Sequence, residues 1–89
     1  MLESGLEDIR EAMLGLLGAA GPKQFPNVTR RIRYATDVQG LWYLRGDQMA
    51  ALASTQGEAA AREQIQRITR MFHGLLPSSL TSRPSPLTD

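Results

Sequence analysis

The chain shows a helical hydrophobic pattern at both ends and a strand-like pattern in its middle. From about residue 5 to residue 17, apolar residues recur every three or four positions, which is typical of a helix with one buried face. Ser4 and Glu7 fit an N-terminal capping box, and Gly18 or Gly21 would end the helix. The predicted buried stripe comprises Leu6, Ile9, Met13, Leu16, Leu17 and Ala20.

The middle of the chain, residues 28–45, is predicted to form an antiparallel hairpin. Asp37 and Gly40 suit its turn, because an Asp side chain bonds local backbone and Gly adopts a left-handed conformation. Side chains of the two strands would then alternate between two faces. The face expected in the core carries Ile32, Tyr34, Trp42 and Leu44. The face expected in solvent carries Arg31, Arg33, Ala35, Tyr43 and Arg45.

The second helical region is expected to begin with Asp47 as its N-cap. It has a short apolar stripe of Met49, Leu52 and Ala53, and a later stripe of Ala61, Ile65, Ile68, Phe72 and Leu75. On one straight helix these stripes would point in different directions. We therefore predict a bend within residues 54–57, where Thr55 and Glu58 fit a second capping box, and a helix end near Gly74.

These elements predict an α+β fold of order α-β-β-α, with the helices on one face of the antiparallel hairpin and the last helix kinked near 54–57. Residues 1–76 would form one small domain, and residues 77–89, rich in Pro, Ser and Thr, a disordered tail. A lone two-stranded sheet is marginal and leaves both edges open. Pairing of two hairpins would remedy this, so we expect a homodimer.

Composition argues against the common forms of catalysis. The 89 residues include no Cys and one His, so a disulfide framework and a thiolate zinc site are excluded. No serine lies in a nucleophile motif, and no Gly-rich phosphate loop is present. We therefore expect no enzyme activity, no cofactor and no metal. The longest apolar stretch is too short to cross a bilayer, so we expect a cytoplasmic protein without a membrane partner.

Charge singles out the hairpin, although the formal net charge is only +1. In the predicted register Arg33 lies opposite Arg45, a like-charge pair that is unfavourable unless an anion lies nearby. The candidate anion- or partner-binding residues are Arg31, Arg33, Tyr43 and Arg45. A competing interpretation is that the arginines pair with acids of the first helix, in the same chain or a partner. Those acids are Glu3, Glu7 and Glu11.

The sequence thus predicts a non-enzymatic protein-interaction or regulatory module that self-associates, and an acidic protein or a nucleic acid would be the partner of its arginine face. The alternative is a nucleic-acid-binding accessory protein, in which the arginines hold phosphates while Tyr43 stacks on a base. The near-neutral total charge speaks against the alternative, because dedicated nucleic-acid binders usually carry a strong basic excess.

Overall fold

The computed structural model describes residues 2–76, with side chains from residue 5 onward, and this range contains helices and no strand. The helices are α1 (Leu2–Leu17), α2 (Gly21–Gln24), α3 (Pro26–Tyr34), α4 (Val38–Tyr43), α5 (Arg45–Gln56) and α6 (Glu58–Met71). The predicted α+β fold is therefore wrong, because the expected hairpin folds as α3 and α4. The predicted disordered tail, residues 77–89, lies outside the described residues.

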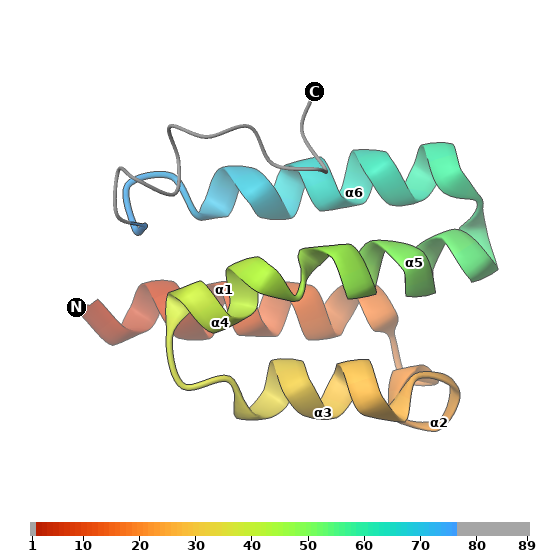
Figure 1. Cartoon of the computed structure of the whole chain (residues 1–89), viewed down its shortest axis with the longest axis horizontal. Helices are drawn as coiled ribbons and strands as arrows, with labels where there is room; N and C mark the ends of the chain where they lie inside the picture. Colours follow the sequence, from red (N-terminus) through yellow and green to blue (C-terminus); the bar gives the residue numbers. More distant parts are fainter. Residues whose placement is uncertain (1, 77–89) are drawn as a thin grey trace.

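Helix α1 packs against α3, α4, α5 and α6, and so lies at the centre of the fold. Helices α5 and α6 run side by side in opposite directions (Figure 1). The chain breaks at Gly57, whose φ of 91° is in the left-handed region, inside the predicted interval 54–57. It reverses there instead of kinking, so the predicted kinked helix is also wrong. The reversal turns the stripes of α5 and α6 toward one core.

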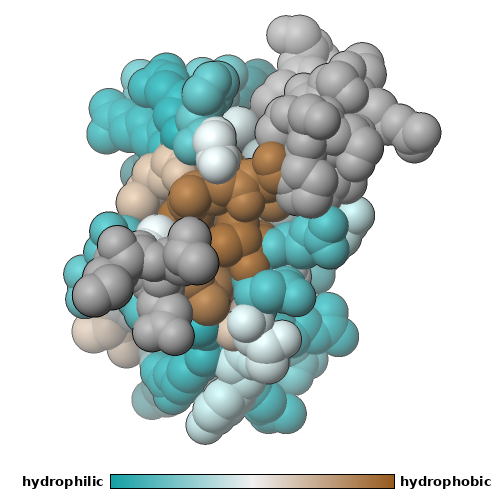
Figure 2. Space-filling view, turned by 90° about the vertical axis from the view of Figure 1, so that its left-hand side faces the viewer, coloured by the Kyte–Doolittle hydropathy of each residue, from teal (hydrophilic) through white to brown (hydrophobic). Residues whose placement is uncertain are grey.

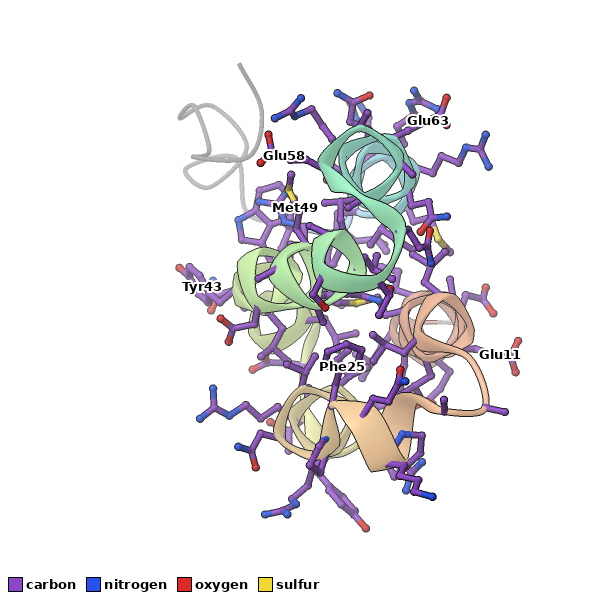
Figure 3. The ribbon with its side chains drawn as sticks, turned by 90° about the vertical axis from the view of Figure 1, so that its right-hand side faces the viewer. Glu11, Phe25, Tyr43, Met49, Glu58 and Glu63 are labelled. Atoms are coloured by element: carbon purple, nitrogen blue, oxygen red, sulfur yellow. The ribbon has the colours of Figure 1, made fainter. Side chains whose placement is uncertain are left out.

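The core confirms most of the apolar stripes expected near both ends of the domain, but Ala20 and Leu75, which were predicted to belong to them, are exposed. Its buried members are Ile9, Met13, Leu17, Ile32, Leu41, Ala51, Leu52, Ala61, Ile65, Ile68 and Phe72. Phe72 is the fully buried ring, and the half-buried ring of Trp42 meets it edge to face at 5.1 Å between centroids. Tyr34, expected in the core, is 70 % exposed. Phe25 is half-buried and points inward between α3 and the helices above it (Figure 3).

The segment predicted as the first strand is helical because its buried residues follow a helical spacing. Thr29 and Ile32 are buried, three positions apart, and Val28 is half-buried beside them. The alternating residues Ile32 and Tyr34 also fit a strand, and a segment this short does not separate the two periods. Pro26 at the first helical position further suits a helix start.

The predicted hairpin turn is the N-terminus of α4. The Asp37 carboxylate oxygen Oδ1 accepts a hydrogen bond from the Gly40 backbone N–H at 2.8 Å, which makes Asp37 the N-cap. An Asp side chain bonded to nearby backbone stabilises turns as well as helix starts, so the bond predicted for a hairpin turn is found here at the start of a helix.

The ends of α1 agree only in part with the prediction. The helix starts before Ser4, whereas Gly18, with a φ of 75°, ends it as expected.

A single arginine of α1 closes the C-terminal end of α3. The Arg10 guanidinium donates hydrogen bonds to three backbone carbonyl oxygens, those of Ile32 (2.8 Å), Arg33 (2.6 Å) and Ala35 (2.9 Å). The last carbonyls of a helix lack partners within it, and a cation there also interacts favourably with the helix dipole. Arg10 therefore fixes the end of α3, and the linker after it, to α1.

We expect Arg10→Met to lower the free energy of unfolding by about 2–3 kcal/mol, because it removes charge-assisted hydrogen bonds to part-buried carbonyls. Urea unfolding measures the loss. The matched control is Glu7→Gln, which removes only the 3.1 Å ion pair between Glu7 and Arg10. That pair is exposed on the Glu7 side and should contribute less than about 1 kcal/mol. Equal losses in both variants would show that the ion pair, and not the cap, is the stabilising contact.

Candidate functional site

The four residues expected to form one binding face do not share a face. Arg31 and Arg33 are exposed on α3, and Tyr43, at the end of α4, is 66 % exposed. Arg45, the first residue of α5, is only 2 % exposed. The cross-strand pair of Arg33 and Arg45 is not formed either, because both residues lie in helices. A binding role for Arg31, Arg33 and Tyr43 stays a prediction.

Arg45 joins three helices inside the domain. Its guanidinium carbon lies 3.4 Å from the centroid of the Trp42 ring on α4, a cation–π contact. Its Nη1 donates to the Thr69 hydroxyl of α6 at 2.8 Å, and its Nε donates to the Trp42 carbonyl oxygen at 3.1 Å. Burial lowers the pKa of Arg45 to about 10, so the group stays charged at neutral pH. These contacts give Arg45 a structural role.

Among the described side chains, no acid of α1 forms an ion pair with an arginine of α3. Glu7 pairs with Arg10 of its own helix, and Glu11 points into solvent on the side of α1 away from Tyr43 (Figure 3). The side chain of Glu3 lies outside the described part. Arg31 instead approaches Asp47 of α5 at 3.5 Å, with both side chains more than half exposed. Such a pair contributes about 0–1 kcal/mol, so it leaves Arg31 available to another anion.

An open groove of about 490 Å³ lies between α3 and α4. Its lining residues are Arg30, Arg31, Tyr34, Ala35, Thr36, Asp37, Gly40 and Leu44. Helix α3 supplies two arginines and a tyrosine, the linker supplies Ala35, Thr36 and the acidic Asp37, and Gly40 and Leu44 complete the lining. The groove therefore combines positive charge at its rim with a mainly apolar interior.

The linker side of the groove is held in place from two directions. The Ala35 carbonyl oxygen accepts from Arg10, and Asp37 caps α4. Gly40 lies close against both residues: a β-carbon added there would be 3.3 Å from Asp37 Oδ1 and 3.5 Å from the Ala35 β-carbon. The missing side chain thus lets α4 begin directly against the linker. The groove is consequently a preformed feature of the fold.

Sequence reasoning missed Arg30, Tyr34 and Leu44 as site residues. Tyr34 was assigned to the core, and Arg30 was not placed on any binding face. On a helix, positions three and four apart lie on one side, which brings Arg30 and Arg31 together with Tyr34. That spacing was present in the sequence, but it identifies a shared wall only once residues 26–34 are known to be helical.

No family model, no curated protein and no solved structure matches the chain. Between residues 2 and 76, no helix is long and apolar enough to cross a membrane. The same part of the chain has no group of three or more metal-binding side chains that could hold an ion. The groove between α3 and α4 is therefore the feature from which function is argued.

We expect Arg45→Gln to destabilise the fold by about 2–4 kcal/mol, since it removes the cation–π contact and the bond to Thr69. Arg31→Gln should change stability by less than about 0.5 kcal/mol, because that side chain is exposed. Urea unfolding of both variants compares the two sites. If both variants were as stable as the parent protein, Arg45 would have no structural role despite its burial.

Proposed function

We propose that this protein is a non-enzymatic interaction module whose groove between α3 and α4 binds an acidic segment of a partner protein. The observation that carries the proposal is the apolar groove with Arg30 and Arg31 on one wall. A guanidinium forms paired hydrogen bonds with a carboxylate, which favours arginine at sites that recognise acidic side chains. The apolar interior suits one aliphatic or aromatic side chain placed between the acids.

Charge favours a protein over a nucleic acid, because the net charge of +1 lacks the strong basic excess of nucleic-acid binders. Asp37 lines the groove and Asp47 approaches Arg31 beside it, so both carboxylates disfavour any anionic group placed directly against them. One observation supports the second candidate, nucleic-acid binding: Tyr34 is 70 % exposed beside two arginines and could stack on a base.

The homodimer expected from the sequence was motivated by open strand edges, and the described range has no strands. The groove is formed within one chain, so the proposal does not require a dimer, and self-association stays an untested expectation. A cytoplasmic location likewise stays an expectation from the sequence. Neither is needed for the groove to bind an acidic segment.

The first test uses a labelled peptide of glutamates with one central leucine, and fluorescence anisotropy to measure its Kd. We expect the double variant Arg30→Gln, Arg31→Gln to weaken binding about tenfold, since charge-assisted hydrogen bonds contribute about 1.5–3 kcal/mol. The matched control is Arg33→Gln, on the same helix but outside the groove lining. An equal loss in the control would show diffuse attraction between charges instead of recognition in the groove.

The second test separates the apolar contact from the charge. Tyr34→Ala should weaken binding of the leucine peptide about threefold to tenfold, as expected when a partly exposed ring loses its contact. Tyr43→Ala is the matched control, because Tyr43 is about as exposed yet does not line the groove. A peptide with serine in place of leucine should bind the parent protein more weakly. Tighter, strongly salt-dependent binding of single-stranded DNA or RNA would favour the second candidate.

A further inference from the structure

The linker between α3 and α4 carries an exposed hydroxyl group, that of Thr36, which lies outside both helices. The backbone on either side of it is extended, with φ −60° and ψ 132° at Ala35 and φ −151° and ψ 170° at Asp37. The linker runs along one end of the molecule (Figure 1), and Figure 2 shows mainly hydrophilic side chains over the lower part of that end, where α3 lies. Thr36 is therefore accessible to an enzyme that acts on exposed, extended segments.

Arginines precede this hydroxyl at the spacing that basophilic protein kinases select. Arg33 lies three positions before Thr36, and Arg31 lies five positions before it. Kinases discriminate among substrates partly by such patterns of charge around the acceptor residue. No other serine or threonine in the sequence has an arginine three positions before it. The charge pattern and the exposed hydroxyl therefore coincide at one residue.

Thr36 also lines the groove together with two cations. The charged residues of the lining are Arg30, Arg31 and Asp37, so positive charge prevails there. A phosphate on a threonine carries a charge of about −1.5 to −2 at pH 7, and its three oxygens accept charge-assisted hydrogen bonds from arginine. The Asp37 carboxylate opposes a phosphate, but its Oδ1 already accepts a hydrogen bond from the Gly40 N–H. A phosphate on Thr36 would therefore engage the same arginines that the groove offers to a partner.

We propose that Thr36 is a phosphorylation site and that its phosphate prevents acidic segments from binding the groove. A serine/threonine kinase transfers the γ-phosphoryl group of ATP to Thr36 Oγ1. The bond between the γ-phosphorus and the β–γ bridging oxygen breaks, a bond from phosphorus to Oγ1 forms, ADP leaves, and the hydroxyl proton passes to the catalytic carboxylate of the kinase.

The phosphate then competes with a partner from within the same chain. A group tethered beside Arg30 and Arg31 acts at an effective concentration of about millimolar, far above that of a free segment at micromolar concentration. This regulatory step rests on the proposed function of the groove, whereas phosphorylation of Thr36 and its contact with the arginines do not.

The first measurement locates the phosphate. The full-length chain is incubated with ATP and a kinase that selects arginine three residues before its acceptor, and mass spectrometry maps the product. We expect a phosphate on Thr36 and its loss in Thr36→Val. A parent chain that takes up no phosphate at Thr36 under these conditions overturns the proposal.

Phosphorus NMR then shows whether the arginines hold the phosphate, with no partner present. The second pKa of a phosphothreonine is about 6, and neighbouring cations lower it because they favour the dianion. We expect this pKa to be about half a unit lower in the phosphorylated parent than in phosphorylated Arg30→Gln, Arg31→Gln. The matched control is Arg62→Gln, Arg67→Gln, which removes the same charge from exposed positions of α6 and should leave the pKa of the phosphate unchanged. Equal pKa values in the parent and the groove variant would contradict the proposed contact.

Fluorescence anisotropy with the peptide of glutamates and one leucine measures the regulation. Phosphorylation should raise the Kd of the parent at least about tenfold, because it removes charge-assisted hydrogen bonds to the partner. Treatment of Thr36→Val with kinase and ATP should not change that variant's own Kd. A parent Kd that stays the same after phosphorylation overturns the regulatory role. If the unmodified chain binds no peptide but the pKa of the phosphate is lowered, the proposed function of the groove fails and the phosphorylation site holds.

Discussion

The hydrogen bonds from Arg10 to the end of α3 are the constraint on which the arrangement of the basic segment depends. They satisfy carbonyls that a helix leaves unpaired, and they hold the Ala35 carbonyl, so the linker must leave α3 in one direction. That direction brings Asp37 to the start of α4, where it caps the helix. Arg10, the basic residue of the otherwise acidic α1, thus positions the groove between α3 and α4 by bonding backbone carbonyls at the end of α3.

Buried polar side chains join the remaining helices. Arg45 contacts Trp42 and Thr69, and Gln48, which is fully buried, donates from Nε2 to the Met13 carbonyl oxygen of α1 at 2.6 Å. The Gln48 Oε1 atom has no hydrogen-bond partner among the described residues, which is unfavourable in a core. Such contacts are directional, whereas apolar contacts are not, and we infer that they fix how α5 sits on α1 and α6.

The sequence predicted the outer parts of this fold and failed in the middle for identifiable reasons. The stripes around Ile9 and Ile65 extend over three or more turns, long enough to distinguish a helix from a strand. Residues 28–45 contain two short elements, and the first of them is capped at its C-terminal end by Arg10, more than twenty positions away. Burial of Arg45 was equally hidden, because a charge is expected in solvent unless a ring and acceptors surround it. The groove is formed by the packing of α3 and α4, and the hydrophobic pattern had not identified either segment as a helix, so the groove could not be predicted.

Helix α4 joins the groove to the core of the domain. It is six residues long and too short to be stable by itself, so its position depends on the Asp37 cap and on burial of Leu41. Val38 packs against the core, and Gly40, two positions later, lines the groove. The core contact and the groove therefore depend on the same turn of helix, whose cap is exposed to solvent. A partner that fills the groove would contact this turn and favour its capped, helical state.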